Sequence, residues 1–138
     1  MELYIVRHGI TTWNKERRIQ GSSDIPLAEE GVEMARKTAK GLSDISFDRI
    51  YSSPLIRAYE TAQIIKGDRK LEIIQDERLR EMGFGIGEGA EYIEPGQEGD
   101  SLLEGFYDCP QDYQAPEGGE SFYDVCRRAC LLYTSRCV

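Results

Sequence analysis

The 138-residue sequence contains one histidine, His8, and four cysteines, all in its last third. The cysteines have no C-x-x-C spacing, and a single histidine cannot complete a zinc site with them, so we expect free thiols and no metal cofactor. No apolar run is long enough to cross a bilayer, and residues 1–6 are too short for the apolar part of a signal peptide. These absences predict a cytoplasmic protein with no membrane partner.

Basic residues are absent between Arg80 and Arg127, and the whole chain carries a net charge of −8. Such a charge disfavours nucleic acid as a partner, so any bound anion must be held by a local basic cluster. The length predicts a single domain at most. Residues 83–119, rich in glycine, proline, tyrosine and acids, are interpreted as a lid-like insertion with a short helix near residues 101–107.

Apolar patterns predict alternating strands and helices along the first part of the chain. Strands are expected at residues 3–6, within 47–54 and at 71–76, and helices at 26–42 and from Pro54 to about Lys66. Ser53 is the expected N-cap of the second helix, and Gly67 lies past its end. A last helix begins within residues 120–133. This order predicts an α/β fold built on a mostly parallel sheet.

Two strand ends carry residues suited to binding phosphate. His8 follows the first strand and Arg57 follows the second, and the carboxyl ends of parallel strands share one rim. Arg57 falls in the first turn of a helix, where a cation is disfavoured unless an anion lies beside it. Free backbone N–H groups at that end and the Arg7 guanidinium would bind the anion, together with the amide of Asn14 and backbone kept approachable by Gly21.

The chemistry suggested by this rim is phosphoryl transfer. Neighbouring guanidinium groups favour the neutral imidazole of His8, which is a nucleophile, and they stabilise the charged transition state. Glu81 is the expected proton donor to the leaving alcohol and must be protonated before transfer. Glu88 is the rival donor, but its position among glycines favours a structural role. His8 as a hydrogen-bonded structural residue and Arg57 as a solvated charge remain alternatives.

Five segments together resemble the histidine phosphatase superfamily, also called phosphoglycerate mutase-like: RHGITTWN, RIQGSSDIPLAEEG, YSSPLIRAYETA, LREMGFGIGEG and PEGGES. The resemblance covers residues 1 to about 128. It implies a three-layer α/β fold with helices on both faces of the sheet, a small phosphomonoester as substrate and no cofactor. It also implies a nucleophile, His8, a proton donor, Glu81, and residues that contact phosphate or line its pocket: Arg7, Asn14, Gln20, Gly21 and Arg57.

The resemblance also exposes an absence, because family members carry a second histidine at the end of a later strand. We therefore expect a chain that is incomplete at the C-terminus, with residues 129–138 as a non-native tail. Such a chain would fold poorly and turn over little by itself, since the family's missing strand lies beside the first one. Sequencing the source locus past Arg128 tests this expectation, and a contiguous stop after Val138 would contradict it.

A phosphatase is favoured over a phosphoglycerate mutase, because a mutase must also hold a substrate carboxylate and residues 81–126 offer no cation for it. A non-catalytic phosphate-binding module is the alternative from another class.

Overall fold

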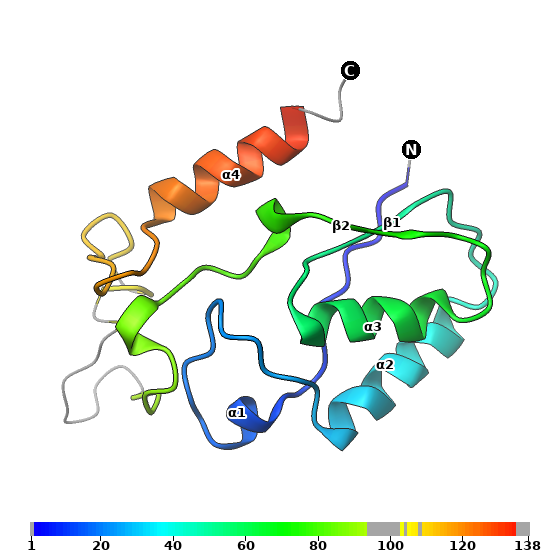
Figure 1. The fold of residues 1–138 in the computed structure, drawn as a ribbon, viewed down its shortest axis with the longest axis horizontal. Coiled ribbons are helices and arrows are strands. Elements are labelled where there is room, and N and C mark those ends of the chain that lie inside the picture. The colour runs from blue at the N-terminus through cyan, green and yellow to red at the C-terminus, as the bar shows by residue number, and fades with distance from the viewer. Residues whose placement is uncertain (1, 94–102, 104, 108, 135–138) are drawn as a thin grey trace. The chain divides into compact units, whose positions relative to one another are not determined.

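The structure is a computed structural model that describes residues 2–93, 103, 105–107 and 109–134 (Figure 1). The chain separates into two compact units, one made of Met1–Thr12 and Asp24–Glu77 and the other of Trp13–Ser23 and Arg78–Val138. We describe each unit by itself, and the expected single domain stays a prediction. No helix in the described residues is long and apolar enough to cross a membrane.

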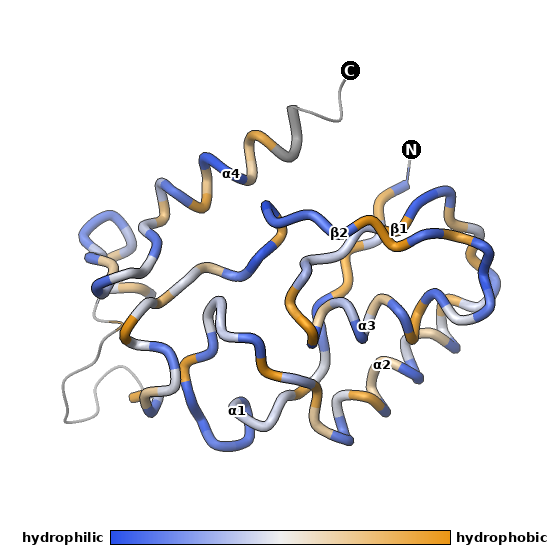
Figure 2. Tube along the Cα trace, viewed as in Figure 1, coloured by the Kyte–Doolittle hydropathy of each residue, from blue (hydrophilic) through white to orange (hydrophobic). Residues whose placement is uncertain are grey.

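The first unit is built on two parallel strands, β1 (Ile50–Ser52) and β2 (Ile73–Gln75), joined through helix α3 (Ile56–Lys66). Ile50 pairs with Ile73 and Tyr51 with Ile74, and such β-branched and aromatic residues suit a pleated surface. Figure 2 shows hydrophobic colour over much of β2 and over only part of β1. Helix α2 (Glu29–Gly41) packs against α3. The predicted strand–helix–strand unit of residues 47–76 is therefore confirmed.

The start of α3 differs from the prediction. The helix begins at Ile56 instead of Pro54, and the expected N-cap, Ser53, lies outside it, its hydroxyl accepting the N–H of Leu55 at 3.3 Å. The carboxylate of Asp24 accepts the N–H of Ile56 at 2.6 Å and so caps the helix from a distant part of the chain. This tertiary contact replaces the local cap that the sequence suggested.

The end of α3 agrees with the prediction. Gly67 has a φ of 51° and its N–H donates to the carbonyl of Gln63 at 3.1 Å. A left-handed backbone of this kind suits glycine and ends the helix there.

The strand expected at residues 3–6 is wrong, because residues 2–10 form no strand and the side chains of Leu3 and Ile5 are 75% and 88% exposed. A strand needs a neighbour that accepts and donates its backbone hydrogen bonds. Within the described ranges, the only ladder joins β1 to β2. An apolar pattern alone could not supply the missing partner.

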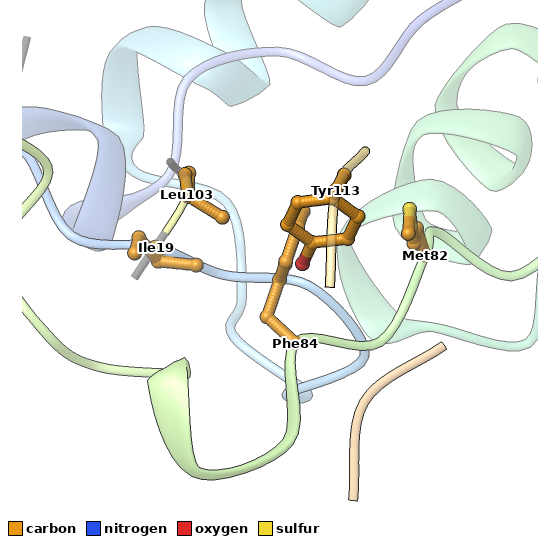
Figure 3. Packing of buried hydrophobic residues seen from close by; sticks show 5 residues of the cluster. All are labelled: Ile19, Met82, Phe84, Leu103 and Tyr113. Atoms are coloured by element: carbon orange, nitrogen blue, oxygen red, sulfur yellow. The ribbon is translucent and has the colours of Figure 1, made fainter. Parts of the chain in front are cut away.

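The second unit holds a small core drawn from three separate stretches of sequence (Figure 3). Its buried residues are Ile19, Met82, Phe84, Leu103 and Tyr113. The unit also contains α4 (Phe122–Thr134) and the 3₁₀ turn Gly85–Gly87. Most of α1 (Thr12–Lys15) and of the 3₁₀ turn Glu77–Leu79 belongs to it as well, whereas their first residues, Thr12 and Glu77, belong to the first unit.

The residues expected to form a lid contribute to this core. Leu103 and Tyr113 belong to segment 83–119 and are each only 8% exposed, and Phe84 forms an antiparallel bridge with Gly119. Residues 94–102, 104 and 108 lie outside the described residues, and with them three positions of the helix expected near 101–107. The described residues of that stretch, 103 and 105–107, form turns. The lid and the tail at 129–138 stay predictions.

The predicted free thiols are confirmed for the three cysteines described, which are exposed: Cys109, Cys126 and Cys130. Cys137 lies outside the described residues.

Gly31 of helix α2 packs against the backbone of Ile10, two residues after His8. A Cβ on Gly31 would collide with the carbonyl oxygen of Ile10, whereas a Cβ on Gly41, at the end of the same helix, would meet nothing within 4 Å. We expect Gly31→Ala to lower the free energy of unfolding by about 1–3 kcal/mol through this collision. Gly41→Ala is expected to raise it by about 0.5 kcal/mol through helix propensity. Urea denaturation of both variants measures this, and a shift of equal sign in the two would contradict it.

Candidate functional site

His8 and Arg57 lie together in the first unit. The Nδ1 of His8 is 2.7 Å from the carbonyl oxygen of Gly9, and its Nε2 is 3.2 Å from the Nε of Arg57. A carbonyl oxygen can only accept a hydrogen bond, and a guanidinium Nε–H can only donate one. The partners therefore assign the proton to Nδ1 and leave a lone pair on Nε2. This tautomer is the neutral form of the imidazole, and the nucleophilic role expected of His8 stays a prediction.

Arg57 is buried, with 1% of its surface exposed, and it lies in the first turn of α3 as expected. Its helical position is supported by Thr61, whose hydroxyl donates to the carbonyl of Arg57 at 2.7 Å. Burying a guanidinium is costly unless hydrogen bonds and charges compensate it. A buried guanidinium in contact with an imidazole is a group suited to binding an anion.

The helix terminus beside Arg57 is less open than the sequence suggested. The N–H of Ile56 is taken by the Asp24 carboxylate. That donor is not available to a phosphate while this bond exists, so the expectation of free N–H groups is wrong for Ile56. The guanidinium of Arg57 remains a side-chain donor of the first unit in contact with His8.

The remaining predicted residues are found in both units. Arg7 is exposed in the first unit. In the second unit, Asn14 is an exposed residue of α1, Gln20 is half-buried, and Gly21 is buried with a φ of 55°. A Cβ on Gly21 would strike the carboxylate of Glu88, so only glycine fits there. The grouping of these residues with His8 stays a prediction.

Glu81, the expected proton donor, is an exposed residue of the second unit, and its carboxylate accepts the N–H of Met82 at 3.1 Å. The next two residues, Met82 and Gly83, are buried. Glu81 is therefore a polar side chain presented to solvent by a stretch of backbone that is anchored immediately after it.

Glu88 has the structural role that the sequence favoured. Its carboxylate accepts hydrogen bonds from the N–H and hydroxyl of Ser22 at 2.7 and 2.8 Å, from the N–H of Phe84 at 3.0 Å, and from the hydroxyl of Ser23. Burial would raise the pKa of Glu88, but these hydrogen bonds outweigh it, and the pKa lies below its usual value. An ionised, fully engaged carboxylate cannot serve as a proton donor, so Glu88 joins two loops instead.

Sequence reasoning assigned no role to three charged residues that the structure places in polar networks. Asp24 caps α3, while Glu120 and Arg128 form an ion pair next to the Glu81 segment. Asp24 and Glu120 lie in two of the five segments that resemble the family. That position in the sequence is the signal from which their roles could have been suspected. No group of three or more His, Cys, Asp or Glu side chains suited to a metal ion occurs in the described part of the chain.

Comparison with known proteins places these features in a family. The family model described as "Histidine phosphatase superfamily (branch 1)" matches residues 3–133. "Phosphoglycerate mutase-like protein 4" of Arabidopsis thaliana is 41% identical over 133 residues, which cover 93% of this chain and 58% of the relative. "Probable phosphoglycerate mutase GpmB" of Proteus mirabilis is 36% identical and is covered to 59%.

Solved structures agree with this match. Bacillus stearothermophilus YhfR has a TM-score of 0.78 and 40% identity, and the alpha-ribazole phosphatase from Shigella flexneri has a TM-score of 0.81 and 30% identity. Each match covers 94% of this chain and 63% of the neighbour, so the chain spans less than two thirds of these relatives. The neighbours confirm the predicted α/β fold class. The chain belongs to the histidine phosphatase superfamily, branch 1.

Proposed function

We propose that this chain carries the nucleophilic part of a phosphomonoester hydrolase that works through a phosphohistidine on His8. The observation that supports the proposal most is the contact of Arg57 Nε with Nε2 of a His8 ring whose proton is held on Nδ1 by Gly9. A guanidinium beside this nitrogen is suited to bind the phosphate of a substrate. When a phosphoryl group enters, Arg57 turns its donors to the phosphate oxygens and the Nε2 lone pair becomes free to attack.

The reaction proceeds in two displacements at phosphorus. Nε2 of His8 forms a bond to phosphorus while the ester P–O bond breaks, and the departing alkoxide takes a proton from the carboxylic acid of Glu81. Water then attacks the phosphohistidine, the P–N bond breaks, and Glu81 recovers a proton from that water. The charge that moves onto the phosphate oxygens is stabilised by Arg57, with Arg7 and Asn14 as further contacts and with Gln20 and Gly21 lining the pocket.

The substrate proposed is a small phosphorylated molecule. Two neighbours are titled as an alpha-ribazole phosphatase and a glucosyl-3-phosphoglycerate phosphatase, which favours hydrolysis of small phosphomonoesters. Phosphoglycerate mutase activity is the second candidate, because relatives bear that name. The absence of lysine and arginine from residues 81–126 argues for the phosphatase, since a phosphoglycerate carboxylate needs a cation. A non-catalytic phosphate-binding role is the third candidate function.

Trapping the phosphoenzyme tests the proposal. The full reading frame that contains this chain is mixed with p-nitrophenyl phosphate, quenched in base within milliseconds, and analysed by intact mass and peptide mapping. We expect one added phosphoryl group, lost in acid and kept in base, on the peptide that contains His8. With a phosphoglycerate as substrate we expect free phosphate as the main product.

Two outcomes would overturn the assignment. Isomerised phosphoglycerate without released phosphate would establish the mutase instead. Vanadate binding without any phosphoenzyme or phosphate release would establish the non-catalytic module.

A further inference from the structure

Glu120 and Arg128 form a bidentate ion pair in the second unit. Nε of Arg128 lies 2.8 Å from Oε1 of Glu120, and Nη2 lies 2.9 Å from Oε2. Side-chain exposure is 19% for Arg128 and 30% for Glu120, so the pair is partly shielded from water. A guanidinium and a carboxylate in this parallel geometry hold each other in a fixed orientation.

Both members of the pair also bind the backbone around Glu81. Arg128 donates through Nη1 to the carbonyl oxygens of Arg78 at 3.0 Å and Arg80 at 2.8 Å. Glu120 accepts the N–H of Gly83 at 2.8 Å through Oε2, and its own N–H donates to the carbonyl of Gly83 at 2.8 Å. These hydrogen bonds hold the backbone on both sides of Glu81, while the Glu81 side chain itself stays exposed.

We infer that the Glu120–Arg128 pair positions Glu81 for proton transfer; the inference rests on the proposed function, in which Glu81 is the donor. A carboxyl group on a loose loop would sample many orientations, and proton transfer requires hydrogen-bond distance to the leaving oxygen. Three contacts from the two paired side chains and one from the backbone N–H of Glu120 restrict the loop at residues 78, 80 and 83. Glu120 and Arg128 are positioning residues and touch no substrate.

The charge state of the pair suits this task. The hydrogen bond from Arg128 lowers the pKa of Glu120 more than burial raises it, and the pKa lies below its usual value of 4.5. Glu120 is therefore ionised at neutral pH, and its ion pair with Arg128 keeps both charges.

The test compares leaving groups. An alkyl phosphate needs a proton on its leaving oxygen, whereas p-nitrophenolate leaves without one, so a misplaced donor slows the first substrate selectively. We expect Arg128→Lys and Glu120→Gln, assayed in the full reading frame, to lower kcat/KM for an alkyl phosphate by about tenfold or more, because kcat/KM reports the steps up to departure of the leaving group. Their kcat/KM for p-nitrophenyl phosphate should fall by less than about threefold. Glu81→Gln should show the same selectivity, and Arg127→Lys, an exposed neighbour on α4, should show none.

The outcomes separate this inference from the proposed function. Equal loss with both substrates would mean that the pair only stabilises the fold, and no loss with either would mean that it has no role; each result overturns the inference and leaves the wild-type phosphohistidine in place. A wild-type enzyme that forms no phosphohistidine overturns the proposed function itself, and the positioning role with it. Melting temperatures of all variants accompany the kinetics.

Discussion

Replacement of His8 by alanine is expected to abolish the phosphoenzyme and to lower kcat for p-nitrophenyl phosphate by on the order of 10⁴-fold or more. The substitution removes Nε2, the atom that would form the bond to phosphorus. His8 is the only histidine in these 138 residues. The measurement is steady-state hydrolysis by the full reading frame, with the quenched phosphoenzyme as a second readout.

Binding separates a chemical defect from an unfolded variant. Because Arg57 and the proposed phosphate contacts remain, His8→Ala should still bind vanadate or inorganic phosphate, with a dissociation constant changed by less than about tenfold. Calorimetry measures this affinity. A variant that hydrolyses substrate at the wild-type rate would show that His8 is not the nucleophile, and its ring would then be a structural residue bonded to Gly9 and Arg57.

Replacement of Arg57 by alanine is expected to lower kcat/KM by about 10²–10³-fold, because it removes the charge that stabilises the transition-state oxygens. Arg57→Lys should recover part of this loss, since lysine keeps the charge but not the paired donors. Phosphate affinity should fall in both variants. Hydrolysis rates and phosphate titrations on the full reading frame measure these effects.

Arg36→Ala is the matched control for Arg57. Arg36 is an exposed arginine of α2 whose guanidinium pairs with Glu33 at 2.6 Å, three residues away on the helix surface. Its removal changes the net charge by the same amount without touching His8, so activity should stay within about twofold and stability within about 0.5 kcal/mol. Equal losses in Arg36→Ala and Arg57→Ala would mean that only the general charge of the chain matters.

Features of secondary structure that depend on neighbouring residues in the sequence were predicted correctly, whereas those that depend on contacts between distant residues were not. β1, α3 and β2 could be predicted because each depends on local apolar spacing, and the end of α3 could be predicted because Gly67 supplies a backbone conformation that other residues avoid. The start of α3 could not, because its cap comes from Asp24, far away in the sequence. The expected strand at residues 3–6 failed for a related reason: apolar residues do not make a strand without a partner for their backbone groups.

By itself, the sequence determined the family, predicted that His8 and Arg57 lie together, and indicated a structural role for Glu88. Each of these depends on residue type at a short spacing after a predictable element. Only the tertiary structure decided which ring nitrogen of His8 carries the lone pair, and that Glu120 and Arg128 grip the backbone beside Glu81. A hydrogen bond between residues far apart in the chain has no periodicity and leaves no local pattern to recognise, so it appears only when the chain has folded.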